Sequence, residues 1–146
     1  MARGTILGMA LREENLTRER YRERYGPDVS PAEAAVELEV LGSDYGANGY
    51  TTVAQADGLA AALSLAPGHR LLDLGTGCGW PGLYLTRITG CSSVLTDLSV
   101  PAMARARCRA TEDSTTARTA VVVASARHLP FRPESFDAIV HTDVLC

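Results

Sequence analysis

The second half of the chain alternates short apolar runs with segments of helical periodicity, and this alternation constrains the fold more than any other feature. The apolar runs are typical of buried strands and cover residues 70–74, 93–97, 120–124 and 136–141. Two helices are predicted between the first three runs, over residues 80–89 and from Ser99 to about Ala110. Strands separated by helices in this rhythm predict an α/β fold with a doubly wound parallel sheet. The first of these helices should carry Trp80, Leu83, Tyr84 and Ile88 on one side.

The first 26 residues are dense in charges of both signs. Mixed charges at helical spacing are typical of a solvated helix, whose sizeable anchors here are Leu16, Tyr21 and Tyr25. A nucleic-acid-binding arm is the alternative interpretation, and the interleaved glutamates argue against it.

Two further helices are predicted before the first strand. Ser30-Pro31-Ala32-Glu33 forms a capping box with proline at the first helical position, so a helix should cover residues 31–41 and stop at Gly42. Thr51 or Thr52 can cap a second helix, which should end at Pro67-Gly68.

The charge balance limits the possible partners. The 146 residues carry 14 Lys and Arg against 17 Asp and Glu, a net charge of −3. We therefore expect a small-molecule substrate, with neither nucleic acid nor a membrane as partner. No apolar run is long enough to span a membrane. The four cysteines show neither C-x-x-C pairing nor metal-ligand spacing, which predicts free thiols, no metal and a cytoplasmic location.

A glycine-rich loop, Asp73-Leu74-Gly75-Thr76-Gly77-Cys78-Gly79, follows the first predicted strand. Glycines at alternate positions permit a sharp turn and should bring backbone amides against a ligand at the carboxyl end of the sheet. Asp97 ends the second strand, where its carboxylate can accept hydrogen bonds from ribose hydroxyls. The combination predicts an adenosine-containing cofactor.

The glycines alone leave the cofactor open, because Gly77 to Gly82 also satisfies the dinucleotide pattern G-x-G-x-x-G. A carboxylate at Asp73 would repel a pyrophosphate but would pair with the ammonium group of a methionine moiety. Pro81 removes one amide from the helix start where a phosphate needs donors. The electrostatics favour S-adenosylmethionine (SAM) over a nicotinamide dinucleotide.

Four landmarks in order resemble the class I SAM-dependent methyltransferases. Asp73-x-Gly75-x-Gly77-x-Gly79 resembles motif I of that family, and Asp97 stands where its second strand ends in an acid. The stretches 128–131 and 135–140 are similar to the third and fourth motifs of its small-molecule members. The resemblance implies a cap segment of N-terminal helices over residues 1–50 and a SAM-binding Rossmann-like half-domain over residues 51–146.

The same resemblance implies a role for each matching residue. Asp73 and the loop residues Gly75, Thr76, Gly77 and Gly79 would hold the methionine part, and Asp97 the ribose. Leu98 would face the adenine, Ala126 and Arg127 would border its other edge, and His141 would lie beneath the sulfonium or the substrate. Family members often carry an Asp after the third strand, where this chain has Ala124-Ser125-Ala126-Arg127.

Several interpretations stay open. His141 is either a general base or a polar residue lining the site. The segment with Tyr45, Gly46 and Tyr50 could fold over the methionine end or pack as an ordinary loop. The family's sheet has further strands beyond the fourth, so the edge of this strand is expected to be exposed and could pair with a completing chain or a second copy.

The function expected from these residues is methyl transfer from SAM to a small-molecule acceptor. A SAM-binding remnant or interaction module without activity is the first alternative. A nicotinamide-dependent oxidoreductase is the weaker one.

Overall fold

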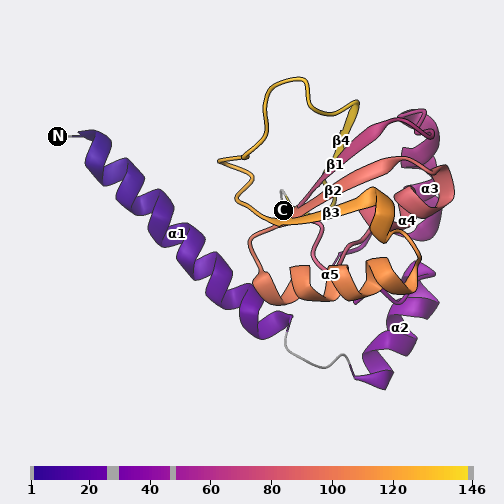
Figure 1. The fold of residues 1–146 in the computed structure, drawn as a ribbon. Helices are drawn as coiled ribbons and strands as arrows, with labels where there is room; N and C mark the ends of the chain where they lie inside the picture. The colour runs from indigo at the N-terminus through magenta and orange to yellow at the C-terminus, as the bar shows by residue number, and fades with distance from the viewer. Residues whose placement is uncertain (1, 26–29, 47–48, 145–146) are drawn as a thin grey trace.

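The structure is a computed structural model that describes residues 2–25, 30–46 and 49–144. The described strands form one parallel sheet in the order β3-β2-β1-β4 (Figure 1). Their bounds are β1 (Arg70–Leu74), β2 (Ser92–Asp97), β3 (Thr119–Val123) and β4 (Ala138–Val140). At the centre of the sheet Leu72 stands opposite Val94 of β2 and Ile139 of β4. The doubly wound parallel sheet predicted from the sequence is confirmed.

Strand β4 is shorter than the predicted run over residues 136–141. It pairs with β1 only along Leu71–Asp73, and Asp137 before it is bonded to Arg70 at the start of β1 through both its amide and its carboxylate. The strand order places β4 at one edge of the described sheet, and the Ile139 side chain is 54% exposed. Pairing of this edge with another chain stays a prediction.

Helices α4 (Gly82–Thr89) and α5 (Val100–Glu112) connect successive strands, and a short 3₁₀ turn, η1 (Thr116–Arg118), leads into β3. Both crossovers run the same way across the sheet, so right-handed connection puts α4 and α5 on one face. Helix α4 begins two residues later than predicted, because Pro81 takes the N-cap position. Ile88 was predicted to lie on the same side of the helix as Leu83, but Leu83 is buried and Ile88 is 44% exposed. It follows Leu83 by five residues, which turns it about 140° around the helix.

The N-terminal helices are α1 (Ala2–Arg24), α2 (Pro31–Leu41) and α3 (Val53–Ala62). The predicted bounds of α2 are confirmed, and its capping box forms between Ser30 and Glu33. Helix α3 is capped by Thr52 and Gln55, but it ends earlier than predicted, where Ser64 takes a left-handed conformation with φ 49°.

Helix α1 reaches outward from the sheet, and its carboxyl-terminal end packs beside the start of α5 (Figure 1). Tyr25 is buried there, as predicted, but Leu16 is 60% exposed and does not anchor the helix. No helix in the described part of the chain is both long and apolar enough to cross a membrane.

The main core lies between the sheet, α3, α4 and α5. Its fully buried side chains from these elements include Ala56, Leu71, Leu83, Leu95 and Ala106. Because this core holds β1 and β2 rigidly side by side, the residues at their carboxyl ends keep fixed positions.

Candidate functional site

A cavity of about 210 Å³ opens at the carboxyl ends of β1, β2 and β3. Several segments of the chain meet around it: the glycine loop, the end of β2, the end of β3, the residues after β4, helix α1, and Gly49 between α2 and α3. The lining residues are Thr17, Tyr21, Tyr25, Gly49, Gly75, Thr76, Gly77, Trp80, Thr96, Asp97, Leu98, Ala124, Ala126, Thr142, Asp143 and Val144. The cavity lies where open parallel sheets bind their ligands.

The glycine loop is bonded to the end of β2. The amides of Gly75 and Thr76 both donate to the carbonyl of Thr96, at 2.8 and 3.1 Å. The Gly77 amide donates to Asp97 Oδ2 at 3.0 Å. Gly77 has φ 56° and Gly75 φ 71°, backbone conformations that favour glycine. These amides hold the loop against β2, and a contact between them and a ligand stays a prediction.

The Asp97 carboxylate stands at the wall of the cavity. Its Oδ1 accepts a hydrogen bond from the Ser99 amide at 2.8 Å, and its Oδ2 accepts the one from Gly77. Burial raises the pKa of Asp97, and the bonds from backbone amides oppose that shift. Each carboxylate oxygen can accept a second hydrogen bond, so the group can still receive hydroxyl donors from the cavity.

Asp73 lies beneath the loop and does not line the cavity. It is fully buried, and its Oδ2 accepts hydrogen bonds from Thr76 Oγ1 at 2.7 Å and from the Gly82 amide at 2.9 Å. Its Oδ1 is buried with no hydrogen-bond partner among the described residues. Burial raises the pKa of Asp73 to about 7, against the lowering effect of the two bonds. A contact between Asp73 and a methionine ammonium therefore stays a prediction.

The start of α4 offers little to a pyrophosphate. Pro81 has no amide hydrogen, the Gly82 amide donates to Asp73, and the Leu83 amide donates to the Gly79 carbonyl at 2.8 Å. Phosphate sites at helix starts need amides that point at the ligand. The sequence from Gly77 to Gly82 therefore matches G-x-G-x-x-G, but its helix start does not present free amides to a pyrophosphate.

Helix α1 supplies a wall that the sequence did not predict. Tyr21 and Tyr25 stack with their ring centroids 5.9 Å apart, and the Tyr25 hydroxyl lies 2.5 Å from where a Cβ on Gly77 would stand. One turn of helix separates the two tyrosines, and this spacing was the only available signal. Their charged neighbours indicated a solvated helix instead.

The polar side of α1 also contacts the segment after β3. Ser125 Oγ donates to Glu14 at 2.6 Å, and Arg127 pairs with Glu13 at 3.3 Å. Ala126 lines the cavity, whereas Arg127 points to α1 and is absent from the lining.

The other predicted residues divide between the cavity and its surroundings. Leu98 lines it, but Gly79 and the exposed His141 do not. Tyr50 is 83% exposed and lies outside the lining. Thr142 and Val144, which follow β4, line the cavity and were not predicted.

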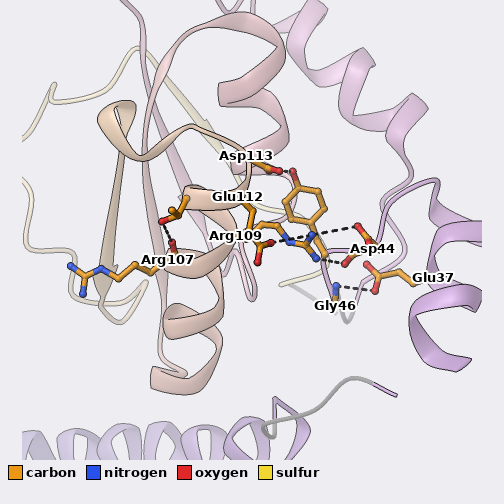
Figure 2. Close-up of polar contacts among 9 residues, drawn as sticks. Glu37, Asp44, Gly46, Arg107, Arg109, Glu112 and Asp113 are labelled. Atoms are coloured by element: carbon orange, nitrogen blue, oxygen red, sulfur yellow. Dashed lines mark hydrogen bonds and ion pairs between the residues drawn. The ribbon is translucent and has the colours of Figure 1, made fainter. Parts of the chain in front are cut away.

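Tyr45 is part of the core and does not fold over the cavity. Its hydroxyl donates to Asp113 at the end of α5, and its ring lies 4.9 Å from the Arg109 guanidinium. Figure 2 shows how Arg109 also pairs with Asp44, at 3.6 Å, so the loop between α2 and α3 is fastened to α5. Of this loop, Gly49 reaches the cavity.

The fold and the position of this cavity define a Rossmann-like domain with a cavity at the carboxyl ends of its parallel strands. The chain belongs to the class I SAM-dependent methyltransferases: the family described as "methyltransferase domain" matches residues 72–146. SAM is the cofactor of this family.

Three individual relatives are similar to this chain. Methyltransferase GfsG of Streptomyces halstedii is 35% identical over 77 residues, which cover 53% of this chain and 28% of GfsG. A SAM-dependent methyltransferase from Geobacter sulfurreducens, solved with S-adenosylhomocysteine, is 28% identical with a TM-score of 0.57 over 64% of this chain and 37% of its own. The [4+2]-cyclase SpnF is 31% identical with a TM-score of 0.55, over 57% of this chain and 31% of its own. The chain thus spans about a third of the length of these relatives.

Proposed function

We propose that this chain binds SAM in the described cavity and takes part in methyl transfer to a small-molecule acceptor. The observation that carries the proposal is the Asp97 carboxylate, held at the cavity wall beside Gly75 and Gly77 in a member of a SAM-dependent family. A carboxylate in that position can accept hydrogen bonds from the two hydroxyls of a ribose.

The residues around the cavity fit such a cofactor. Val144 packs against the loop at Gly75, where a Cβ would lie 2.4 Å from Val144 Cγ2. Asp97 supplies hydrogen-bond acceptors and Leu98 an apolar surface. When bound, SAM supplies a methyl group that its sulfonium already activates. The chain then has to orient the acceptor and exclude water, for which Tyr21, Tyr25 and Trp80 provide aromatic walls.

The charge of the chain supports a small-molecule acceptor. A net charge of −3 gives no general attraction for nucleic acid. The lining is neutral apart from Asp97 and Asp143. We also propose a cytoplasmic location, supported by the free thiols of Cys78, Cys91 and Cys108.

The test is calorimetric titration of the chain with S-adenosylhomocysteine, with NADH as competitor. We expect micromolar binding that Asp97→Ala weakens at least about tenfold, equivalent to about 1.4 kcal/mol. Asp57→Ala is the matched control, because it removes a carboxylate that bonds Tyr84 away from the cavity. A folded chain that prefers NADH, or that binds neither compound, contradicts the proposal.

Turnover separates the enzyme from a binding module. Formation of S-adenosylhomocysteine from SAM in the presence of an acceptor panel supports methyl transfer. Tight binding without turnover on any acceptor favours the SAM-binding module.

A further inference from the structure

We infer that Asp143 is a positioning residue, which clasps the Gly49–Thr51 segment and so holds one wall of the cofactor cavity in place. The inference rests on the proposed function, because its consequence is a higher affinity for SAM and its product. Neither the family resemblance nor the sequence pattern pointed to this residue.

The clasp consists of three hydrogen bonds to one carboxylate oxygen. Asp143 Oδ2 accepts from the Tyr50 amide at 2.9 Å, from the Thr51 amide at 3.3 Å and from Thr51 Oγ1 at 3.0 Å. Bonds from neutral donors to an ionised acceptor are stronger than those between neutral groups. They join the segment after β4 to the segment before α3, two parts of the chain more than 90 residues apart.

Gly49 completes the clasp by leaving room for the carboxylate. A Cβ at this position would lie 2.2 Å from Asp143 Oδ2, closer than real contacts allow. The Gly49 backbone is outside the left-handed region, so its conformation does not demand glycine. The close approach of Asp143 is therefore the reason for a glycine here.

A further hydrogen bond connects the Gly49–Thr51 segment to the residue that follows the glycine loop. Trp80 Nε1 donates to the Thr51 carbonyl at 2.9 Å, and Trp80 stands just beyond the loop at the cavity wall. Asp143 and Gly49 line the same cavity, and the next residue, Val144, packs against Gly75. Loss of the clasp would release two walls of the cavity together.

The clasp would raise affinity by ordering these walls before the ligand arrives. Binding then needs less conformational entropy, which is the general benefit of preorganisation. Asp143 has φ 57°, a conformation that Asn and Asp tolerate better than most residues. Asp143→Asn therefore preserves the backbone and one acceptor oxygen while it removes the charge.

The experiment measures S-adenosylhomocysteine binding by calorimetry and amide hydrogen exchange at Tyr50 and Thr51, for the unaltered chain and its variants. We expect Asp143→Ala and Gly49→Ala each to weaken binding about tenfold and to speed exchange of both amides. The affinity of Asp143→Asn for S-adenosylhomocysteine should stay within about threefold of that of the unaltered chain. Gly58→Ala is the matched control, because a Cβ on this α3 residue meets nothing within 4 Å.

Combining Asp143→Ala with Gly49→Ala gives a second criterion. Since both changes break one clasp, the double variant should bind about as weakly as either single variant. Thermal unfolding checks that each variant is folded. Thr51→Val replaces any variant that is not, and it should weaken S-adenosylhomocysteine binding less, because it removes only the hydrogen bond from Thr51 Oγ1.

The outcomes are distinct. Binding by the unaltered chain with no loss in Asp143→Ala or Gly49→Ala overturns the clasp but leaves the proposed function intact. Equal losses in Asp143→Asn and Asp143→Ala, with unchanged amide exchange, mean that the charge meets the ligand directly, which also overturns it. Absence of binding by the folded, unaltered chain overturns the proposed function and this role of Asp143 with it.

Discussion

Replacement of the buried Asp73 by asparagine tests the electrostatics beneath the glycine loop. The Asp73 carboxylate is fully buried, and its Oδ1 has no hydrogen-bond partner among the described residues. Burial raises its pKa from the ordinary 3.8 to about 7. Asp73→Asn keeps an acceptor for Thr76 and Gly82 and resembles the protonated carboxyl in shape and charge.

The direction of the effect follows from proton linkage. Because the pKa is raised on folding, the folded state holds a proton that the unfolded state has lost between about pH 4 and pH 7. The stability contributed by this proton is complete below the unfolded pKa and is lost as the pH rises through the folded pKa. Between about pH 5 and pH 8 the loss covers about two pKa units, or about 3 kcal/mol as an upper value.

Urea unfolding at about pH 5 and pH 8 measures this loss. At about pH 5 Asp73→Asn should already be somewhat more stable than the unaltered chain, because this pH lies above the unfolded pKa. Between about pH 5 and pH 8 this advantage in the free energy of unfolding should grow by about 2–3 kcal/mol, a change in the midpoint difference on the order of 1–2 M urea. Asp57→Asn, at an exposed carboxylate that accepts a hydrogen bond from Tyr84, serves as the control for a generic change of charge.

Parallel pH dependence in the unaltered chain and Asp73→Asn would refute the reasoning, since it would mean that Asp73 does not titrate in this range. A variant that is less stable at both pH values would show that the carboxylate is ionised and paired in the folded state. The same variant should bind S-adenosylhomocysteine at least about tenfold more weakly if the carboxylate meets the methionine ammonium.

Two further predictions concern packing around the sheet. Gly82→Ala should lower the free energy of unfolding by about 1–3 kcal/mol, because a Cβ there would lie 2.5 Å from Leu95 Cδ2; thermal unfolding beside Gly58→Ala checks this, and equal stability of the two variants would contradict it. Tyr45→Phe should lower the free energy of unfolding by about 1–2 kcal/mol, because it removes the tyrosine hydroxyl that donates to Asp113. If the midpoint in urea is unchanged, this bond contributes nothing to stability.

The site was predictable where its residues belong to neighbouring strand ends. A turn after β1 and an acid after β2 must meet at one edge of a parallel sheet, and Gly77 does bond Asp97 there. The contributions of α1 and of the residues after β4 were not predictable. Tyr21 and Tyr25 could be predicted to anchor a charged helix but not to form a wall of the cavity, and nothing local marks Asp143 as a partner of Thr51.

The orientation of Asp73 could not be predicted either. The sequence places this carboxylate next to the loop, but two outcomes are compatible with that placement: a side chain that faces the ligand and one that lies beneath the loop. The structure has the second, because Thr76 and Gly82 fold back over Asp73 and donate to it.

The sequence by itself determined the features that depend on short-range interactions. The capping box at Ser30, the turn at Gly75 and the strand run from Arg70 to Leu74 involve residues a few positions apart, and their chemistry is readable from the chain. Only the tertiary structure decided what closes the cavity. Contacts such as Asp143 with Thr51 join residues far apart in the sequence, and packing of the whole domain selects which of many possible partners meet.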